Sequence, residues 1–219
     1  MPADPERALT IAYAPAALRA GLSALWRLDE RLAAVVAATR DDRIGEIRLA
    51  WWRESLERLD TAPPPDEPML REAAAILLPL GLSGTGLGQI ADGWAALLEP
   101  SPLSDDALVA HARQRGGILF EQAGTILGAQ HGELGNELGH AGEGWALVDL
   151  AWHVRDPATA ERALTLARSR LAGLAGLRWP KALRPLGALA VLAARDAARG
   201  RGGERRIGSP GRVARALAV

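Results

Sequence analysis

The sequence contains no cysteine and, apart from Lys181, no lysine among its 219 residues. Without cysteine the chain has no disulfide, no thiolate nucleophile and no cysteine-ligated metal site. Basic charge is therefore almost entirely arginine. The formal net charge is zero, so no overall field attracts nucleic acid, and we expect no nucleic-acid partner.

Phenylalanine and tyrosine are also scarce, with one residue of each, although tryptophan occurs seven times. Apolar residues make up 48% of the chain, and alanine and leucine dominate them. These two residues favour helices, whereas strands are enriched in β-branched and aromatic residues. No segment alternates with a period of two for long enough to form a convincing strand. The length suits one domain, so we predict a single all-α domain.

No long hydrophobic run is present. The stretch 73–91 lacks charged residues, but Pro79 and several glycines interrupt it, so it does not resemble a membrane span. The first residues show neither a secretory nor a transit pattern. We therefore expect a cytoplasmic protein that does not span a membrane, although peripheral contact with a membrane is compatible with the sequence.

Apolar periodicity predicts a series of helices. Leu18, Leu22, Leu25, Leu32 and Val36 mark one face of a first helix over about 15–39. Further helices are predicted over about 43–59, 67–79, 86–98, 105–129, 133–155, 158–176 and 181–199. The predicted N-caps are Asp41, Thr85 and Ser104, and Pro157 suits a first helical turn. The Gly- and Arg-rich segment 200–219 is predicted to be a solvated, flexible tail, separate from a helical domain over 1–199.

The predicted helix over 43–59 carries adjacent tryptophans. We expect the following residues to lie inside or near its buried stripe: Ile44, Ile47, Trp51, Trp52, Leu56 and Leu59. Neighbours on a helix lie about 100° apart, so Trp51 and Trp52 do not share one narrow stripe. Either both pack in a wide helix–helix contact, which is the interpretation we favour, or one reaches a groove or partner surface beside Arg48.

Familiar catalytic motifs are missing. The sequence has no nucleophile elbow, no dinucleotide-binding fingerprint and no phosphate-binding loop. The four histidines show no zinc-ligand spacing. Carboxylates four residues apart can hold Mg²⁺ on one helix face. Glu133 and Glu137 have this spacing, but a Gly-broken, exposed helix start explains them better.

One weaker constellation is Asp149, His153 and Asp156, with Arg155 beside it. The spacing of four and then three residues places the first three on one helix face. Such groups can line a polar cavity. They can equally form a surface stripe or a structural Asp–Arg network, and this second interpretation is the one that we favour.

Four segments, 13–29, 44–56, 116–128 and 145–156, resemble the squalene/phytoene synthase family. The resemblance extends over about 8–195 and is closest to the branch that contains mitochondrial complex I assembly factors. It implies an isoprenoid synthase bundle of about eight helices around a central cavity. In the family's enzymes two aspartate motifs bind Mg²⁺ and the diphosphates of two prenyl substrates.

The resemblance places the first aspartate motif on 33–37, where this chain has no carboxylate. The second motif keeps Arg155 and Asp156, but it has Trp152 in place of an asparagine and Ala160 in place of its last acidic residue. Arg19 matches an arginine associated with diphosphate binding. A magnesium cluster that has lost most of its oxygen ligands cannot neutralise a departing diphosphate.

We therefore expect an inactive relative, without a metal or other cofactor, that binds an isoprenoid or lipid-like molecule or a protein partner. The branch resemblance implies a role in respiratory-complex assembly. The alternative is a prenyl-diphosphate transferase with a rebuilt Mg²⁺-dependent site at Asp149, His153, Arg155 and Asp156. A purely structural helical subunit is the third possibility.

Overall fold

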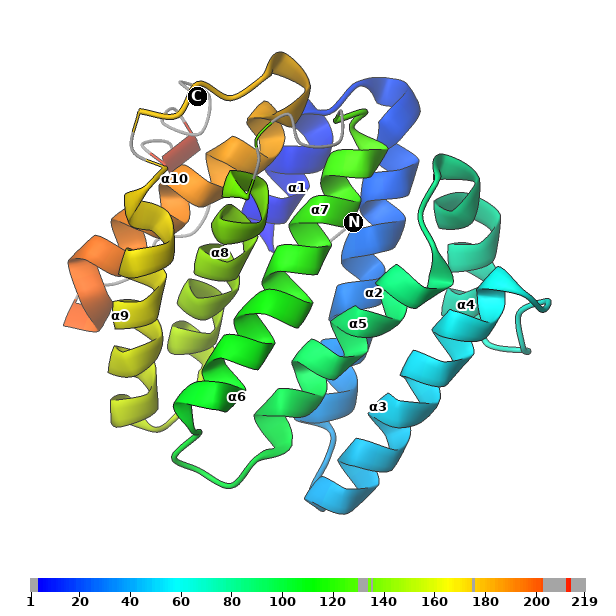
Figure 1. Ribbon diagram of the computed structural model, residues 1–219, viewed down its shortest axis with the longest axis horizontal. Coiled ribbons are helices and arrows are strands. Elements are labelled where there is room, and N and C mark those ends of the chain that lie inside the picture. The colour runs from blue at the N-terminus through cyan, green and yellow to red at the C-terminus, as the bar shows by residue number, and fades with distance from the viewer. Residues whose placement is uncertain (1–3, 130–133, 135, 175, 203–211, 214–219) are drawn as a thin grey trace.

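A computed structural model describes residues 4–129, 134, 136–174, 176–202 and 212–213. Within this part of the chain every regular element is helical and no strand occurs, which confirms the predicted all-α class (Figure 1). The α-helices are α1 Pro5–Tyr13, α2 Arg19–Ala37, α3 Asp42–Glu57, α4 Pro68–Glu72, α5 Gly84–Ala95, α6 Asp105–Ala110, α7 Ile118–Ile126, α8 Glu137–His153, α9 Pro157–Ala172 and α10 Arg184–Arg199.

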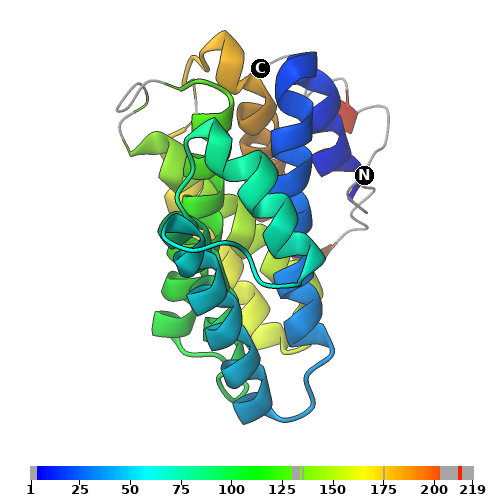
Figure 2. The same cartoon turned by 90° about the vertical axis from the view of Figure 1, so that its right-hand side faces the viewer.

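Two π-helical segments extend α-helices. Ala73–Leu77 follows α4, and His111–Gly117 joins α6 to α7. The second join makes one long rod over 105–126, close to the predicted 105–129. Figures 1 and 2 show that the longer helices form an elongated bundle, with α9 and α10 on one flank and α3 and α4 on the other.

Glycines bring the π segment 111–117 into backbone contact with its neighbours. A Cβ on Gly142 of α8 would lie 2.1 Å from the carbonyl oxygen of Gly116, and a Cβ on Gly93 of α5 would lie 2.3 Å from the backbone nitrogen of Arg115. Neither position therefore tolerates a side chain without a backbone shift. The π segment is wedged between α5 and α8, and this position determines where its side chains point.

Most predicted helix starts are confirmed. The Asp41 side chain accepts a hydrogen bond from Arg43 N at 3.0 Å, Ser104 Oγ accepts one from Ala107 N at 3.1 Å, and Pro157 is the first residue of α9. The prediction for Thr85 is wrong, because Ser83 caps α5 instead by accepting from Gly86 N at 3.0 Å.

The buried face of α3 differs from the predicted one. Gly45, Leu49, Trp52 and Leu56 are buried, at steps of four, three and four residues. By contrast Ile44, Ile47 and Trp51 are 47%, 70% and 45% exposed, so the prediction is wrong for these three members of the stripe, whereas Trp52, Leu56 and Leu59 are buried as predicted. Burial of both tryptophans, which the sequence favoured, is also wrong. Trp51 points outward and meets Trp52 edge-on, with ring centroids 5.4 Å apart.

Helix α1 was not predicted at all. It begins after Asp4, whose side chain accepts a hydrogen bond from Glu6 N at 2.7 Å, and Pro5 occupies its first position. Its buried residues are Glu6, Arg7 and Thr10. These side chains are polar, whereas Leu9 and Ile11 pack against the apolar core only partly buried, and α1 lies against α2 and α10.

Most of the predicted tail, and Glu133 of the predicted acidic pair, lie outside the described residues. Arg212 is described and is buried, with its guanidinium 2.6 and 2.9 Å from the two carboxylate oxygens of Asp196. Among the helices of the described ranges, none combines the length and apolar character needed to cross a bilayer.

Candidate functional site

A pocket of about 730 Å³ opens between α1, α2, the turn after α5, the π segment 111–117 and the end of α8. This volume lies within the usual range of small-molecule sites, about 300–1,000 Å³. Aliphatic side chains form much of its wall. They are Ala33, Val36, Ala37, Leu97, Leu103, Leu150 and Val154.

A buried ionic cluster closes the inner end of the pocket. Asp29 is fully buried and accepts hydrogen bonds from Arg115 Nε and Nη2, at 2.9 and 3.0 Å, and from Trp94 Nε1 at 2.8 Å. Arg7 Nη1 donates to the second Asp29 oxygen at 3.1 Å. Asp149 lies 2.8 Å from Arg115 and 3.7 Å from Arg7. The two arginines are thus held between two aspartates.

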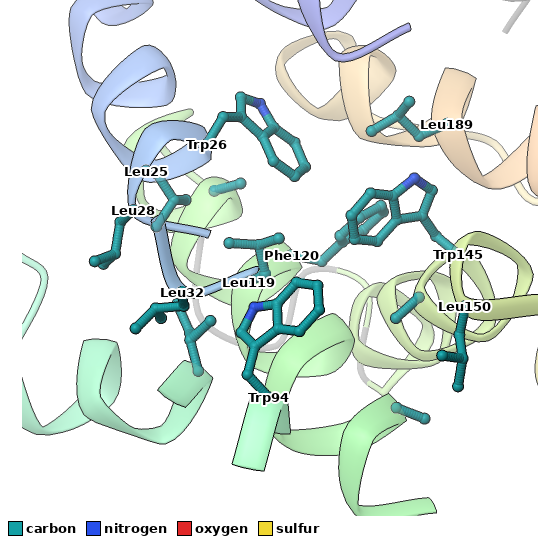
Figure 3. Close-up of a cluster of buried hydrophobic side chains, with 14 of the residues drawn as sticks. Leu25, Trp26, Leu28, Leu32, Trp94, Leu119, Phe120, Trp145, Leu150 and Leu189 are labelled. Carbon is teal, nitrogen blue, oxygen red and sulfur yellow. The ribbon is translucent and has the colours of Figure 1, made fainter. Parts of the chain in front are cut away.

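Indole rings cover the guanidinium groups. Arg115 lies 4.2 Å from the ring centroid of Trp94 and 4.9 Å from that of Trp145. Arg7 lies 5.3 Å from the Trp26 ring and 5.0 Å from the Trp145 ring. Figure 3 shows these three tryptophans converging from α2, α5 and α8. Cation–π attraction and exclusion of water therefore strengthen the ion pairs.

His111 completes the cluster from the π segment. Its Nδ1–H donates to the Gly93 carbonyl at 2.7 Å, which leaves Nε2 to accept from Arg115 Nη1 at 3.4 Å. Burial and the adjacent Arg115 lower the pKa of His111 from 6.5 to about 4. The ring is therefore neutral near neutral pH and serves as an acceptor for Arg115.

The aspartates of the cluster are ionised. Burial opposes the charge of Asp29, but Arg115 and Arg7 outweigh it and hold its pKa below the usual value. The same balance, with the same two arginines, lowers the pKa of Asp149. Burial also opposes the charge of Arg115, and the two aspartates reverse this effect and raise its pKa. The inner end of the pocket is consequently a self-neutralised set of two cations and two anions.

The structure brings together only part of the predicted constellation. Asp149 and His153 both line the pocket, with His153 Nδ1 2.7 Å from the Asp149 carbonyl oxygen and its side chain 72% exposed. Helix α8 ends at His153, so the prediction that Asp156 shares its face is wrong. Asp156 instead caps α9, accepting from the Thr159 amide at 2.7 Å and its hydroxyl at 2.6 Å, and these hydrogen bonds lower its pKa.

The other predicted residues lie away from the pocket. Arg155 is exposed and is not among the lining residues. Arg19 donates to the carbonyls of Ala14 and Ala12 at 3.0 and 2.9 Å, at the end of α1. Arg48 is exposed on α3. Buried Trp52 has the guanidinium of Arg31 5.4 Å from its ring centroid.

The central residues of the cluster were missed from the sequence. Arg7, Asp29, His111 and Arg115 have no motif spacing, because five different segments contribute the cluster's ionic and tryptophan side chains. One signal was present: Asp29 follows Leu22 and Leu25 by seven and four residues and precedes Leu32 by three. A charge in that stripe has to be paired inside the protein.

The pocket does not fit the magnesium that the fold family implies. The described positions of the first aspartate motif that reach the pocket are Ala33, Val36 and Ala37, which supply no oxygen ligand. Asp149 is already engaged by Arg115 and Arg7. In the described residues there is no group of three or more His, Cys, Asp or Glu placed to hold a metal ion. Mg²⁺ prefers several free carboxylate, water and phosphate oxygens.

An all-helical bundle around an apolar pocket is the architecture of the isoprenoid synthase type. The family model for squalene/phytoene synthase matches residues 2–197, and the chain belongs to that family. No curated protein and no solved structure matches the chain.

Proposed function

We propose that this chain is a non-catalytic member of the squalene/phytoene synthase family that binds a lipid-like ligand in its pocket. The observation that carries the proposal is that apolar side chains line the pocket at the positions where the family resemblance expects metal-binding carboxylates. Ala33, Val36 and Ala37 line the space where the family resemblance expects carboxylates, while Asp149 is neutralised by two arginines. These features favour retention of an apolar chain and disfavour ionisation of a diphosphate ester.

The first test measures catalysis directly. Purified protein is incubated with Mg²⁺ and farnesyl or geranylgeranyl diphosphate, and released diphosphate is quantified. We expect release no faster than in buffer, because the charge on the leaving group has no metal cluster to stabilise it. Enzymatic release that Mg²⁺ supports and a chelator abolishes would refute the proposal.

The second test measures occupancy of the pocket. Ala33→Phe places a ring in the pocket wall, whereas Ala34→Phe adds the same ring to an exposed neighbour on α2 that does not line the pocket. Overpacking a site costs about 1–3 kcal/mol, so Ala33→Phe should weaken binding of a prenyl alcohol about tenfold. Calorimetry gives the affinities, and mass spectrometry gives the lipid retained on purification. Equal binding by both variants would place the ligand elsewhere.

The alternative function is prenyl-diphosphate transfer at a rebuilt site, and one observation favours it: Asp149 and His153 do meet in the pocket. This alternative predicts that Asp156→Asn abolishes Mg²⁺-dependent activity, although asparagine still caps a helix. Under our proposal there is no such activity to lose, and the variant folds like the parent protein.

Partner binding is a second candidate function, supported by the outward stripe Ile44, Ile47, Arg48 and Trp51 on α3. The branch resemblance suggests that the partner is a respiratory-complex subunit in the cytoplasm or at a membrane surface. In cells deleted for the gene, we expect Ile47→Ser/Trp51→Ser to fail in restoring the assembled complex on native gels. Glu46→Ser, an exposed change on the same helix, should restore it; full rescue by the double variant would remove this stripe from the function.

A further inference from the structure

We infer that Arg212 is a positioning residue of the pocket: it joins Glu6 of α1 to Asp196 of α10 and so holds α1 in place as one wall of the pocket. Loss of this link should open the pocket without unfolding the bundle. Neither Arg212 nor Glu6 lines the pocket itself. The consequences for ligand exchange depend on the lipid binding proposed above, whereas the position of α1 does not.

The guanidinium of Arg212 is held by two carboxylates from different helices. Its Nη1 and Nη2 donate to the two Asp196 oxygens at 2.6 and 2.9 Å, and its Nε donates to Glu6 Oε1. Each of the three residues is no more than 8% exposed. Bidentate arginine–carboxylate pairs are among the stronger hydrogen-bonded contacts, and burial limits their screening by salt. Arg212 therefore links α1 firmly to α10.

The first turn of α1 belongs to the pocket wall. Pro5 and Arg7, the two neighbours of Glu6 in the chain, line the pocket, as does Asp4 at the N-cap. Successive side chains on a helix lie about 100° apart, so one turn can present Arg7 to the pocket and Glu6 to α10. A displacement of the backbone at Glu6 therefore moves this part of the pocket wall.

Ionic contacts provide much of the docking of α1. Its buried residues are Glu6, Arg7 and Thr10, whereas Leu9 and Ile11 are only partly buried against apolar neighbours. Arg7 enters the ionic cluster on one side, and Glu6 makes the link to α10 on the other. Elements with few buried apolar contacts open locally more easily than the core. Loss of one ionic contact should therefore loosen α1 before the rest of the bundle.

The absence of cysteine allows a single thiol to serve as a probe of pocket access. Leu150 lines the pocket and is 7% exposed, so the thiol in Leu150→Cys should react slowly with a maleimide unless the pocket opens wider. Ala123 is fully buried on α7 and does not line the pocket, so Ala123→Cys reports opening of the core. Each probe is combined with Arg212→Met and, as a matched control, with Arg201→Met at an exposed position.

We expect Arg212→Met to accelerate labelling of Leu150→Cys at least about tenfold, the factor that corresponds to one lost hydrogen bond with a charged group. Labelling of Ala123→Cys should not change, and Arg201→Met should change neither probe. Arg212→Lys keeps the charge but not the planar fork, so its rate should fall between those of the parent and Arg212→Met.

A second variant tests whether Arg212 acts through α1. Glu6→Met removes the carboxylate on the α1 side and should also accelerate labelling of Leu150→Cys. Adding Arg212→Met to Glu6→Met should have little further effect, because both changes break the same link.

A bound prenyl alcohol provides a further measurement through its rates. Farnesol binding can be followed by stopped-flow tryptophan fluorescence, since Trp94 lines the pocket. In Arg212→Met we expect both association and dissociation to be faster, with the affinity changing less than either rate, because a loosened wall eases passage in both directions. A purely structural weakening of the fold would not raise the association rate.

Equal labelling of Leu150→Cys in Arg212→Met and Arg201→Met would overturn the inference. Equal acceleration of both thiol probes would also overturn it, because Arg212 would then support the whole bundle and not the pocket wall. Multiplying effects of Glu6→Met and Arg212→Met would show that Arg212 does not act through α1, with the same consequence. Failure of farnesol to bind would refute the proposed lipid binding, whereas the thiol rates would still decide the role of Arg212.

Discussion

Asp29 should be among the most sensitive positions of this protein, although no sequence motif contains it. It is fully buried and accepts hydrogen bonds from Arg115, Arg7 and Trp94. The substitution Asp29→Asn keeps the shape of the side chain and removes its charge. Arg7 and Arg115 are then left with Asp149 as the one remaining carboxylate among the described cluster residues.

The expected magnitude follows from that imbalance. Removing one partner of a buried ion pair typically destabilises a protein by about 3–5 kcal/mol, because the other charge stays buried without compensation. Whole domains unfold with about 5–15 kcal/mol. Asp29→Asn should therefore remove at least about a fifth of the stability. The amide oxygen of the asparagine keeps part of the hydrogen bonding.

The assay is urea unfolding near neutral pH, followed by far-ultraviolet circular dichroism. Asp66→Asn breaks an exposed pair with Arg71 and should leave the midpoint unchanged, because exposed ion pairs contribute little. The double variant Asp29→Leu/Arg115→Met removes one charge of each sign. It should lose less than the sum of the single changes, by about 2 kcal/mol or more. A loss below about 1 kcal/mol in Asp29→Asn would refute the view that the cluster is energetically central.

Two further predictions concern residues around the cluster. The pKa of His111 is about 4 in the folded protein and about 6.5 in the unfolded chain. The stabilisation that neutral His111 contributes is therefore fully present above about pH 6.5 and is lost as the pH falls towards 4, by about 3 kcal/mol in total. His111→Gln should flatten this slope in urea titrations at several pH values, and an unchanged slope would exclude His111 as its source. Gly142→Ala should lower the melting temperature, because the added Cβ meets the carbonyl oxygen of Gly116. In Gly139→Ala the added Cβ meets only the flexible end of Glu121, so this variant should be more stable by up to about 1 kcal/mol. Equal effects of these two alanines would show that the α8 contact is not close-packed.

The helices with an apolar stripe could be predicted from the sequence. Leu22, Leu25 and Leu32 of α2 are buried as the periodicity indicated. Helix α3 was found, but its buried face was wrong. Gly45 lies against Leu98 and Thr39, and this close contact turns Leu49 and Trp52 inward and leaves Ile47 outside. Periodicity alone cannot distinguish two apolar stripes on one helix when only one has a neighbour.

The site was harder to predict than the fold, for a physical reason. Arg7 lies on a helix whose buried side chains are polar, and Arg115 lies in a π segment whose register differs from the α-helical one. Rules that place charged residues on the surface fail where opposite charges satisfy each other inside. Such pairing depends on the tertiary fold, so Asp29 and Arg115, 86 residues apart, give no local signal.

The pocket chemistry of this protein can change without loss of its fold, because different residues determine the two. Ala33, Val36 and Ala37 lie at the pocket wall and are not buried in the core, so carboxylates could be replaced there with little effect on packing. The helices are held instead by the buried apolar core, by close glycine contacts and by the neutral cluster behind the pocket. In that cluster Arg7 and Arg115 are paired with aspartates, so they are not available to bind an anionic substrate. Family membership therefore fixes the bundle and its cavity, whereas the charges and donors at the wall decide which molecule the cavity accepts.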